Sequence, residues 1–235
     1  MALEAAGIAG GPGACYTHRV PRTPLAALVY VALAALAVGW AALRGNLDLY
    51  HHPAPWLFLG FPASTGVAVA LGLAVGVATI ALTRLLVRTT GWARALHGDL
   101  REVLGPLTGA QIGALALASG VAEELFFRGA MQPALGIVLS SLAFGLVHVG
   151  PTRRYLPWTV WATVMGFVFA FLYRATGELA APLVAHVLIN YENLHFVVAF
   201  DPSPAAASDA ATGELGKKPA DPKLVLRARR PQHPG

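Results

Sequence analysis

Apolar residues along this chain gather into six long blocks that are separated by shorter polar stretches. About 20 apolar residues cross the hydrocarbon core of a bilayer as a helix, at a rise of 1.5 Å per residue. A helix also satisfies its own backbone hydrogen bonds, which lipid cannot do. The pattern therefore predicts six membrane-spanning helices, over Leu25–Leu43, Ser64–Thr83, about Thr108–Phe127, about Pro133–Val149, Pro157–Tyr173 and Leu179 to about Phe200.

The basic residues between these blocks are unevenly distributed. One set of loops and both ends of the chain hold most of them, at Arg19, Arg22, Arg84, Arg88, Arg94, Arg101, Arg153 and Arg154 and at six positions of the tail. The alternate loops are poor in basic residues, with only Arg44, Arg128 and Arg174 near them. The positive-inside rule then predicts that both termini are cytoplasmic, and six spans have the parity that this requires.

The composition supports a membrane protein and excludes a soluble domain. Hydrophobic residues make up 56% of the 235 residues and charged residues only 12%, against about 25% charged in a soluble protein. The mean hydropathy is +0.58. We assign the net charge of +5 to the loops, because no basic stripe with interleaved aromatic residues indicates a nucleic-acid partner. Cys15 is the single cysteine, which excludes an intrachain disulfide.

The chain divides by composition into four parts. Residues 1–24 are a polar N-terminal segment, and residues 25–104 hold two spans and a connector from Arg84 to Glu102 that reads as an interfacial amphipathic helix. Residues 105–200 hold the remaining spans. Residues 201–235 are rich in Ala, Pro, Asp and Lys and predict a disordered basic tail. No internal repeat indicates a transporter built from inverted halves.

Ionisable residues inside the bilayer are confined to the third, fourth and sixth predicted spans. Each charge costs at least about 2.5–3.5 kcal/mol at mid-membrane, so such residues usually have a function. Glu124 and Arg128 are four residues apart and are expected to pair, a contact that would serve helix packing as well as chemistry. Glu123 is rotated about 100° from Glu124. The two glutamates therefore cannot pair equally well with Arg128, and the Glu123 carboxylate remains available to accept a proton from water.

The fourth and sixth spans add two further pairs at helical spacing. Phe144 and His148 share one helix face, and so do His186 and Asn190. A lone membrane histidine usually makes a hydrogen bond between helices. Two histidines, an asparagine and an unpaired carboxylate on three spans instead indicate a polar site, in which His and Asn can donate hydrogen bonds to an oxyanion.

The other polar residues are read as structural or exposed. His51 and His52 fall in a polar loop, and His97 and His233 are expected to be exposed. Glu192 and His195 are expected to pair with each other near the end of the sixth span. The Trp and Tyr residues near span ends fit an interfacial belt, from which Tyr30 is set apart by its place inside the first span.

These three clusters resemble the motifs of the CPBP intramembrane endopeptidases, also known as the CAAX-protease and bacteriocin-processing family or as abortive-infection-like proteins. The motifs are E-E-x-x-x-R, F-x-x-x-H and H-x-x-x-N/D. They stand here, in the same order, as Glu123-Glu124-x-x-x-Arg128, Phe144-x-x-x-His148 and His186-x-x-x-Asn190. The resemblance covers roughly residues 105–198.

The resemblance implies an all-helical protease of the membrane, with roles for each motif residue. Glu123 and His148 would activate water, and His186 and Asn190 would stabilise the oxyanion. Glu124 and Arg128 would support the architecture. The resemblance also implies a membrane-associated or lipidated protein or peptide as the substrate and, from the bacterial character of such sequences, the cytoplasmic membrane as the location.

The residues leave a choice between a metal-free site and a zinc site. Glu123, His148 and His186 could supply the three ligands of a catalytic zinc ion. The helix-borne H-E-x-x-H arrangement is absent, however, and Asn190 beside His186 suits hydrogen bonding better than coordination. We therefore expect no cofactor, with zinc as the runner-up.

The function also has an alternative from another class. A non-catalytic immunity or scaffold protein of the same fold would use the polar cluster only to hold helices together. One geometric point bears on this choice. With a turn near residues 132–134, straight helices put Glu123 about 14 Å and His148 about 22 Å below it. Tilted helices, or a bend near Pro133 and Gly136, would close that gap.

Overall fold

A computed structural model describes residues 22–56 and 65–202 of the chain. In these residues the polypeptide is helical apart from its connections, and its one β-bridge joins His51 to Glu178. The α-helices are α1 (Arg22–Leu43), α2 (Thr65–Thr89), α3 (Gly91–Leu104), α4 (Gly109–Glu123), α5 (Gln132–Leu146), α6 (Leu156–Thr176) and α7 (Ala180–Ala199), with a π-helix η1 (Glu124–Met131) and a short 3-10 turn η2 (Arg153–Tyr155). The predicted polytopic helical bundle is confirmed.

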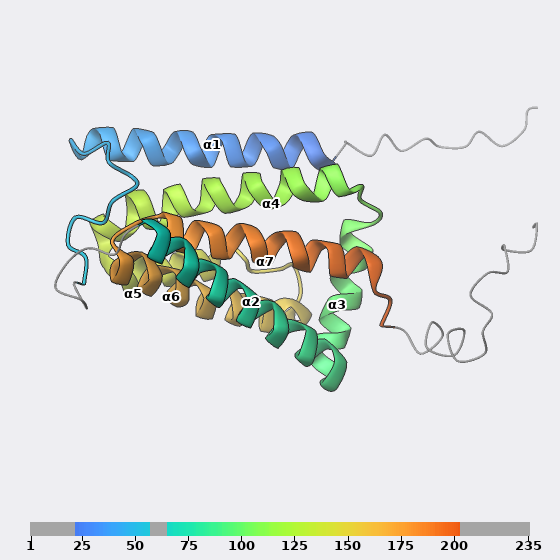
Figure 1. Cartoon of the computed structure of the whole chain (residues 1–235). Coiled ribbons are helices and arrows are strands. Elements are labelled where there is room, and N and C mark those ends of the chain that lie inside the picture. Colours follow the sequence, from blue (N-terminus) through green and yellow to red (C-terminus); the bar gives the residue numbers. More distant parts are fainter. Residues whose placement is uncertain (1–21, 57–64, 203–235) are drawn as a thin grey trace, which may run out of the picture.

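The helices lie side by side with their long axes roughly aligned, except for α3 (Figure 1). Helix α1 lies along α4, and α7 packs between α2 and α4. Helix α3 crosses one end of the bundle, where α1 begins and α7 ends. The two ends of the described chain therefore lie at the same end of the bundle, as the predicted topology requires.

Four stretches of the described residues are long and apolar enough to span a membrane, namely Leu25–Leu43, Thr65–Thr89, Gly109–Leu146 and Arg153–Thr176. The predicted third and fourth spans thus form one stretch of 38 residues. Helix α7 stands where we expected the sixth span and has 20 residues. It is not among the four, because Asn190, Glu192, Asn193 and His195 lower the hydropathy of its second half.

The chain reverses direction at Gly136, inside the stretch that carries the first two motifs. Gly136 has φ 82° and ψ 174°, a backbone conformation that L-residues with a side chain rarely adopt. Glu123 lies 13 residues before this glycine and His148 lies 12 residues after it. At 1.5 Å per residue the two side chains come to nearly the same depth, about 18–20 Å from the reversal. The gap expected from a turn near residues 132–134 is closed for this reason.

Small residues allow the helices to approach closely around this reversal. A Cβ added to Gly120 of α4 would lie 2.6 Å from the Val187 side chain of α7, so glycine sets the distance between these helices. The same contact brings the end of α4 against the middle of α7. The glutamates of α4 and η1 and the polar residues of α7 are thereby held together.

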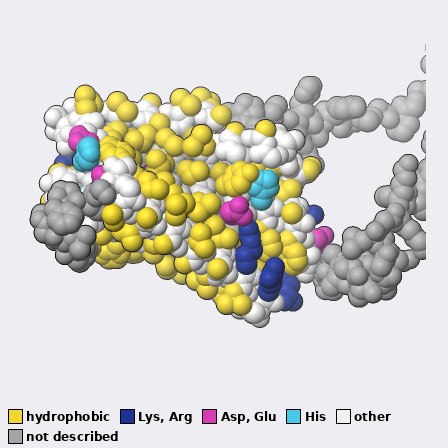
Figure 2. Space-filling model, in the orientation of Figure 1, with side chains coloured by type: hydrophobic (Ala, Val, Ile, Leu, Met, Phe, Trp, Pro, Cys, Tyr) yellow, Lys and Arg dark blue, Asp and Glu magenta, His cyan; other side chains and the backbone are white. Residues whose placement is uncertain are grey.

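The outer surface separates into an apolar body and a basic end. Figure 2 shows hydrophobic side chains over most of the visible face, with Lys and Arg gathered where α2 meets α3. Exposed Arg88 and Arg94 lie at that end. An apolar face suits lipid and a basic end suits the cytoplasmic surface. The molecule is an integral membrane protein.

The connection from α2 through α3 departs in one respect from what the sequence indicated. His97, expected to be exposed, is 3% exposed, and its Nε2 atom lies 2.9 Å from the Phe200 carbonyl oxygen. Arg101 donates to the carbonyls of Val197 and Val198. These bonds tie α3 to the end of α7. Residues 1–21 and 203–235, which include Cys15, His233 and the predicted tail, lie outside the described residues.

Candidate active site

Two consecutive glutamates stand at the junction of α4 and η1 and point to different partners. Glu123 is the last residue of α4, and Glu124 is the first residue of the π-helix. Glu124 is fully buried and Glu123 is 8% exposed. The sequence analysis did not predict this π-helix, a form that appears frequently at functional sites. Its residues Phe126 to Ala130 are all buried.

Glu124 is held by two positively polarised partners. Arg128 places its Nη1 atom 3.2 Å from Glu124 Oε1, which agrees with the predicted pair. His186 of α7 places Nδ1 2.7 Å from the same oxygen. Arg128 is 1% exposed, donates to the Gly166 carbonyl at 3.1 Å and stacks over the Phe144 ring at 4.3 Å. This cluster joins η1, α5, α6 and α7 and has the character of a structural core.

Glu123 faces two imidazole rings without a hydrogen bond. Its Oε2 atom lies 3.8 Å from His148 Nε2 and 4.0 Å from His186 Nε2. The same oxygen is buried and has no hydrogen-bond partner in the described residues. A buried polar atom without a partner is uncommon and calls for an explanation. The separations are too long for direct hydrogen bonds and short enough for one water molecule to bridge.

The protonation of His148 follows from its second ring nitrogen. His148 Nδ1 lies 2.7 Å from the Phe144 carbonyl oxygen, which can only accept, so Nδ1 carries the proton. In the neutral form of the ring, the Nε2 lone pair then faces Glu123. Two acceptors therefore face each other across 3.8 Å. This arrangement suits a water molecule that donates a proton to each of them.

His186 is oriented by Glu124 in the same manner. Its Nδ1 atom donates to the carboxylate of Glu124, and its ring stacks on Phe169 with centroids 4.9 Å apart. Nε2 is left to face Glu123. Asn190, one turn further along α7, donates from Nδ2 to the Ser119 hydroxyl at 2.9 Å. Ser119 lies one turn before Glu123 on α4, so Asn190 stands beside the site.

The structure brings together the residues that the motifs predicted. Glu123, His148 and His186 meet within 4.0 Å, and Asn190 joins them through Ser119. Ser119 was missed, although its four-residue spacing from Glu123 was a usable signal. The predicted pair of Glu192 and His195 is not formed. Glu192 lies 3.6 Å from Arg84, because α2 packs against that face of α7.

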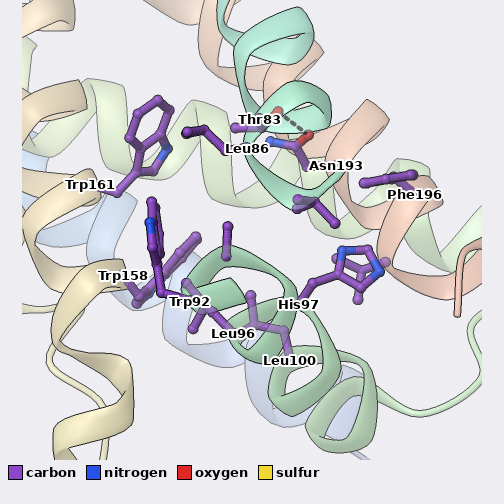
Figure 3. Close-up of a pocket in the computed structure, with 13 residues that line it drawn as sticks. Thr83, Leu86, Trp92, Leu96, His97, Leu100, Trp158, Trp161, Asn193 and Phe196 are labelled. Atoms are coloured by element: carbon purple, nitrogen blue, oxygen red, sulfur yellow. Dashed lines mark hydrogen bonds between the residues drawn. The ribbon is translucent and has the colours of Figure 1, made fainter. Parts of the chain in front are cut away.

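A separate apolar pocket lies beside Trp158, a residue that also contacts His148. The cavity has a volume of about 100 Å³, and Figure 3 shows the tryptophans, leucines and His97 around it. Trp158 lines this cavity and also contacts the His148 ring, with centroids 5.7 Å apart. Burial lowers the pKa of His97 below its usual value. The pocket lining is therefore uncharged at neutral pH.

The fit of a zinc ion can be judged from the same distances. Ligand atoms of a tetrahedral zinc ion stand about 3.3–3.6 Å apart, given bonds of about 2.0–2.2 Å. Glu123 Oε2 lies 3.8 and 4.0 Å from the two Nε2 atoms. In residues 22–56 and 65–202 no group of three or more His, Cys, Asp or Glu residues is arranged to hold a metal ion. Glu123 Oε2 therefore lies slightly further from the two Nε2 atoms than two ligand atoms of a tetrahedral zinc ion lie from each other.

Comparisons with known proteins cover the part of the chain that carries the site. Residues 106–191 match the model of a family described as type II CAAX prenyl endopeptidase Rce1-like. YpbD of Bacillus subtilis (strain 168), an uncharacterized protein, is 33% identical over 76 residues, which are 32% of this chain and 40% of YpbD. YdiL of the same strain, named as a candidate membrane peptidase, is 35% identical over 78 residues, 30% of each protein.

The chain thus spans less than half the length of these two relatives. No solved structure matches the chain. The family match includes all three motifs, from Glu123 to Asn190. Residues 106–191 of this membrane protein thus match the Rce1-like family model, which confirms the resemblance read from the motifs.

Proposed function

We propose that this protein is an intramembrane endopeptidase, which cleaves a peptide bond in a membrane-associated or lipidated protein or peptide. The observation that carries the proposal is the buried Oε2 atom of Glu123, which faces two imidazole nitrogens at 3.8 and 4.0 Å without a hydrogen bond. The description of the matched family as CAAX prenyl endopeptidases supports a lipidated substrate. The Bacillus relatives support the bacterial cytoplasmic membrane as the location.

Glu123 and His148 activate the attacking water. The water donates one hydrogen bond to the Glu123 carboxylate and one to the His148 Nε2 lone pair. As its oxygen bonds to the carbonyl carbon, one proton moves to this pair of bases, and the carbonyl π electrons move to oxygen. The same proton then passes to the amide nitrogen as the C–N bond breaks. One water is consumed, and the products are a carboxylic acid and an amine.

His186 and Asn190 stabilise the oxyanion formed in this step. An Nε2 proton on His186 makes the ring an imidazolium, since Nδ1 already donates to Glu124. Two carboxylates, Arg128 and this imidazolium then sum to zero charge, which suits a buried cluster. A second N–H of Asn190 supplies a neutral donor. Donors of this kind contribute about 10²–10³ in kcat each.

We propose that the reaction needs no metal ion. The hydrogen-bond roles above use Glu123, His148 and His186 as bases and donors, and their spacing is wider than a zinc ligand set. Activity should therefore survive treatment with 1,10-phenanthroline or EDTA. A loss of activity that added zinc restores would contradict the metal-free version and favour the zinc alternative.

The test uses the full chain purified and reconstituted in liposomes. A prenylated CAAX peptide is the first substrate, and mass spectrometry detects the products. Glu123→Gln and His148→Ala should each lose at least about 100-fold in turnover while the protein keeps its abundance and its elution as a folded species. Glu192→Gln, which removes a carboxylate paired with Arg84 outside the site, serves as the control and should retain activity.

A second measurement covers substrates other than this peptide. New N-termini in membrane fractions are compared between cells that produce the wild type and cells that produce Glu123→Gln. Sites cleaved only in the wild type identify the substrate. If neither assay detects cleavage by the wild type, or if Glu123→Gln cleaves as well as the wild type, the non-catalytic alternative is favoured.

A further inference from the structure

A serine hydroxyl on α4 joins the candidate oxyanion donor to the rest of the bundle. Ser119 is 6% exposed. Its Oγ atom accepts a hydrogen bond from Asn190 Nδ2 at 2.9 Å and donates to the Ala116 carbonyl of its own helix at 3.3 Å. Because a hydroxyl has one proton, this donation leaves Ser119 able only to accept from other groups.

The orientation of the Asn190 amide follows from this constraint. A group that can only accept must be met by the NH₂ end of the amide and not by its oxygen. One N–H of Asn190 is used by Ser119, and the second N–H remains for an oxyanion. Without the Ser119 oxygen, rotation of the amide by 180° would present Oδ1 in place of a donor. Ser119 thus selects the productive orientation of Asn190.

Tyr30 of α1 reaches the same serine from outside the segment that matches the family. It shares a helix face with Leu33, Ala37 and Trp40, at spacings of three, seven and ten residues, and this face packs against the core of the bundle. Trp40 contacts Phe126 of η1 with ring centroids 5.8 Å apart. Helix α1 lies along α4 (Figure 1), and the Tyr30 side chain lies near Ser119 and Glu123.

We propose that Ser119 and Tyr30 are positioning residues that hold the Asn190 amide ready for the oxyanion, and that α1 completes the active site in this way. The Tyr30 hydroxyl donates to the second lone pair of Ser119, whose own proton is directed to Ala116. Tyr30 of α1 and Asn190 of α7 thus both donate to Ser119 of α4. The inference rests on the proposed peptidase function.

The first test needs no substrate. The chain contains three asparagines, Asn46, Asn190 and Asn193, so labelling with ¹⁵N-asparagine in detergent micelles gives three side-chain amide signals. Asn190→Ala identifies one of them by its loss. Ser119→Ala and Tyr30→Phe should each shift the Asn190 amide signals and leave those of Asn46 in place. An Asn190 amide that neither variant shifts would overturn the proposal.

The second test measures turnover of the prenylated CAAX peptide. We expect Ser119→Ala to lower kcat about 10-fold and Tyr30→Phe about 3- to 10-fold with little change in KM, since a misplaced donor weakens the transition state more than substrate binding. In the Asn190→Ala background both changes should have almost no further effect, because each acts through Asn190. Multiplicative losses in that background would mean a general structural role and would overturn the proposal.

Ser140→Ala is the matched control. Ser140 is 1% exposed and donates to the Ile137 carbonyl of its own helix, as Ser119 does, but it has no hydrogen bond to a site residue in the described chain. This variant should keep both kcat and the Asn190 signals. If the wild type cleaves nothing, the proposed function fails, and the amide signals still test the contact chain. If the signals move and kcat does not, the contacts exist without a catalytic role and the proposal is overturned.

Discussion

The two neighbouring glutamates give one stretch of chain two opposite environments. Glu124 is fully buried and has both Arg128 and His186 on one oxygen, at 3.2 and 2.7 Å. Glu123 is 8% exposed and has no partner of Oε2 closer than 3.8 Å. Glu124 Oε2 likewise has no hydrogen-bond partner in the described residues, so the two carboxylates differ in their close ion pairs. A closely paired charge stabilises the fold, and a carboxylate without a close partner is available for chemistry. Substitutions that break the contacts of Glu124 should therefore lower stability, and substitutions of Glu123 should lower activity.

The largest effect should follow removal of Arg128. Arg128→Ala breaks a buried ion pair and leaves the Glu124 carboxylate with His186 alone; breaking such a pair costs about 3–5 kcal/mol. We expect low abundance and early loss of the folded peak when the detergent-solubilised protein is heated before size-exclusion chromatography. Arg44→Ala removes an exposed arginine that donates to the Ala130 and Pro133 carbonyls and should cost less than about 1 kcal/mol. Equal losses of stability in Arg128→Ala and Arg44→Ala would contradict the structural role assigned to the Glu124 contacts.

Substitution of Glu123 should instead lower activity and leave stability unchanged. Glu123→Gln removes a carboxylate that lacks a hydrogen bond on Oε2, so the melting temperature should stay the same or rise slightly, as at other strained active sites. Turnover should fall at least about 100-fold. Thermal melts and peptide turnover on the same preparation check both. A drop in melting temperature as large as that of Arg128→Ala would assign Glu123 to the fold.

The stability of the protein should depend on pH through His52, away from the two glutamates. Burial, with the charge of Arg174, lowers the pKa of His52 from 6.5 to about 4. Between pH 6.5 and about pH 4, His52 is therefore protonated in the unfolded chain and neutral in the folded chain. Stability should be constant above about pH 6.5, fall by about 1–3 kcal/mol toward pH 4 and level off below it.

Thermal melts at pH 7.5, 5.5 and 4.5 measure this slope. His52→Phe keeps a ring against Tyr173, whose centroid lies 4.9 Å from that of His52, and should flatten the profile. An unchanged profile in His52→Phe would assign the slope to other groups. His51→Ala is the control from the adjacent, exposed position and should leave the slope as it is.

The smallest effect should follow substitution of Trp158, which lines the apolar pocket and contacts His148. The ring of His148 lies between Phe144 and Trp158, with centroids 4.8 and 5.7 Å away. Trp158→Leu keeps an apolar side chain but removes the ring, so we expect kcat to fall about 3- to 10-fold with the melting temperature nearly unchanged. Trp92→Leu changes the same pocket without a ring contact to His148 among the described interactions and should leave kcat unaltered. Equal losses would point to the pocket as a whole.

The sequence predicted those parts of the site that depend on one helix. The four-residue spacings predicted the Glu124–Arg128 pair and the contact of Phe144 with His148, and both are found. The family motifs predicted which residues meet across helices. The catalytic roles of Glu123, His148, His186 and Asn190 stay predictions until their variants are measured.

Features that depend on tertiary packing were not predictable. The π-helix and the burial of His97 have no local sequence signal, since they follow from how α3 and η1 dock on their neighbours. Tilted helices or a bend near Pro133 and Gly136 could each bring Glu123 and His148 to the same depth. The backbone angles of Gly136 show that the chain bends there. The six apolar blocks correctly predicted a helical bundle, but the third and fourth blocks form one helical stretch.

The reversal at Gly136 also decides how far the following helix penetrates. Helix α5 ends at Leu146, ten residues after Gly136, so its second half extends about 15 Å, or half of a hydrocarbon core of about 30 Å. Non-helical backbone at such depth is stable only where protein or water satisfies it. Protein satisfies part of the segment after Leu146, since the Thr159 hydroxyl of α6 donates to the His148 carbonyl at 3.1 Å. The backbone that carries His148 is thereby anchored to α6 at the point where the half-length helix ends.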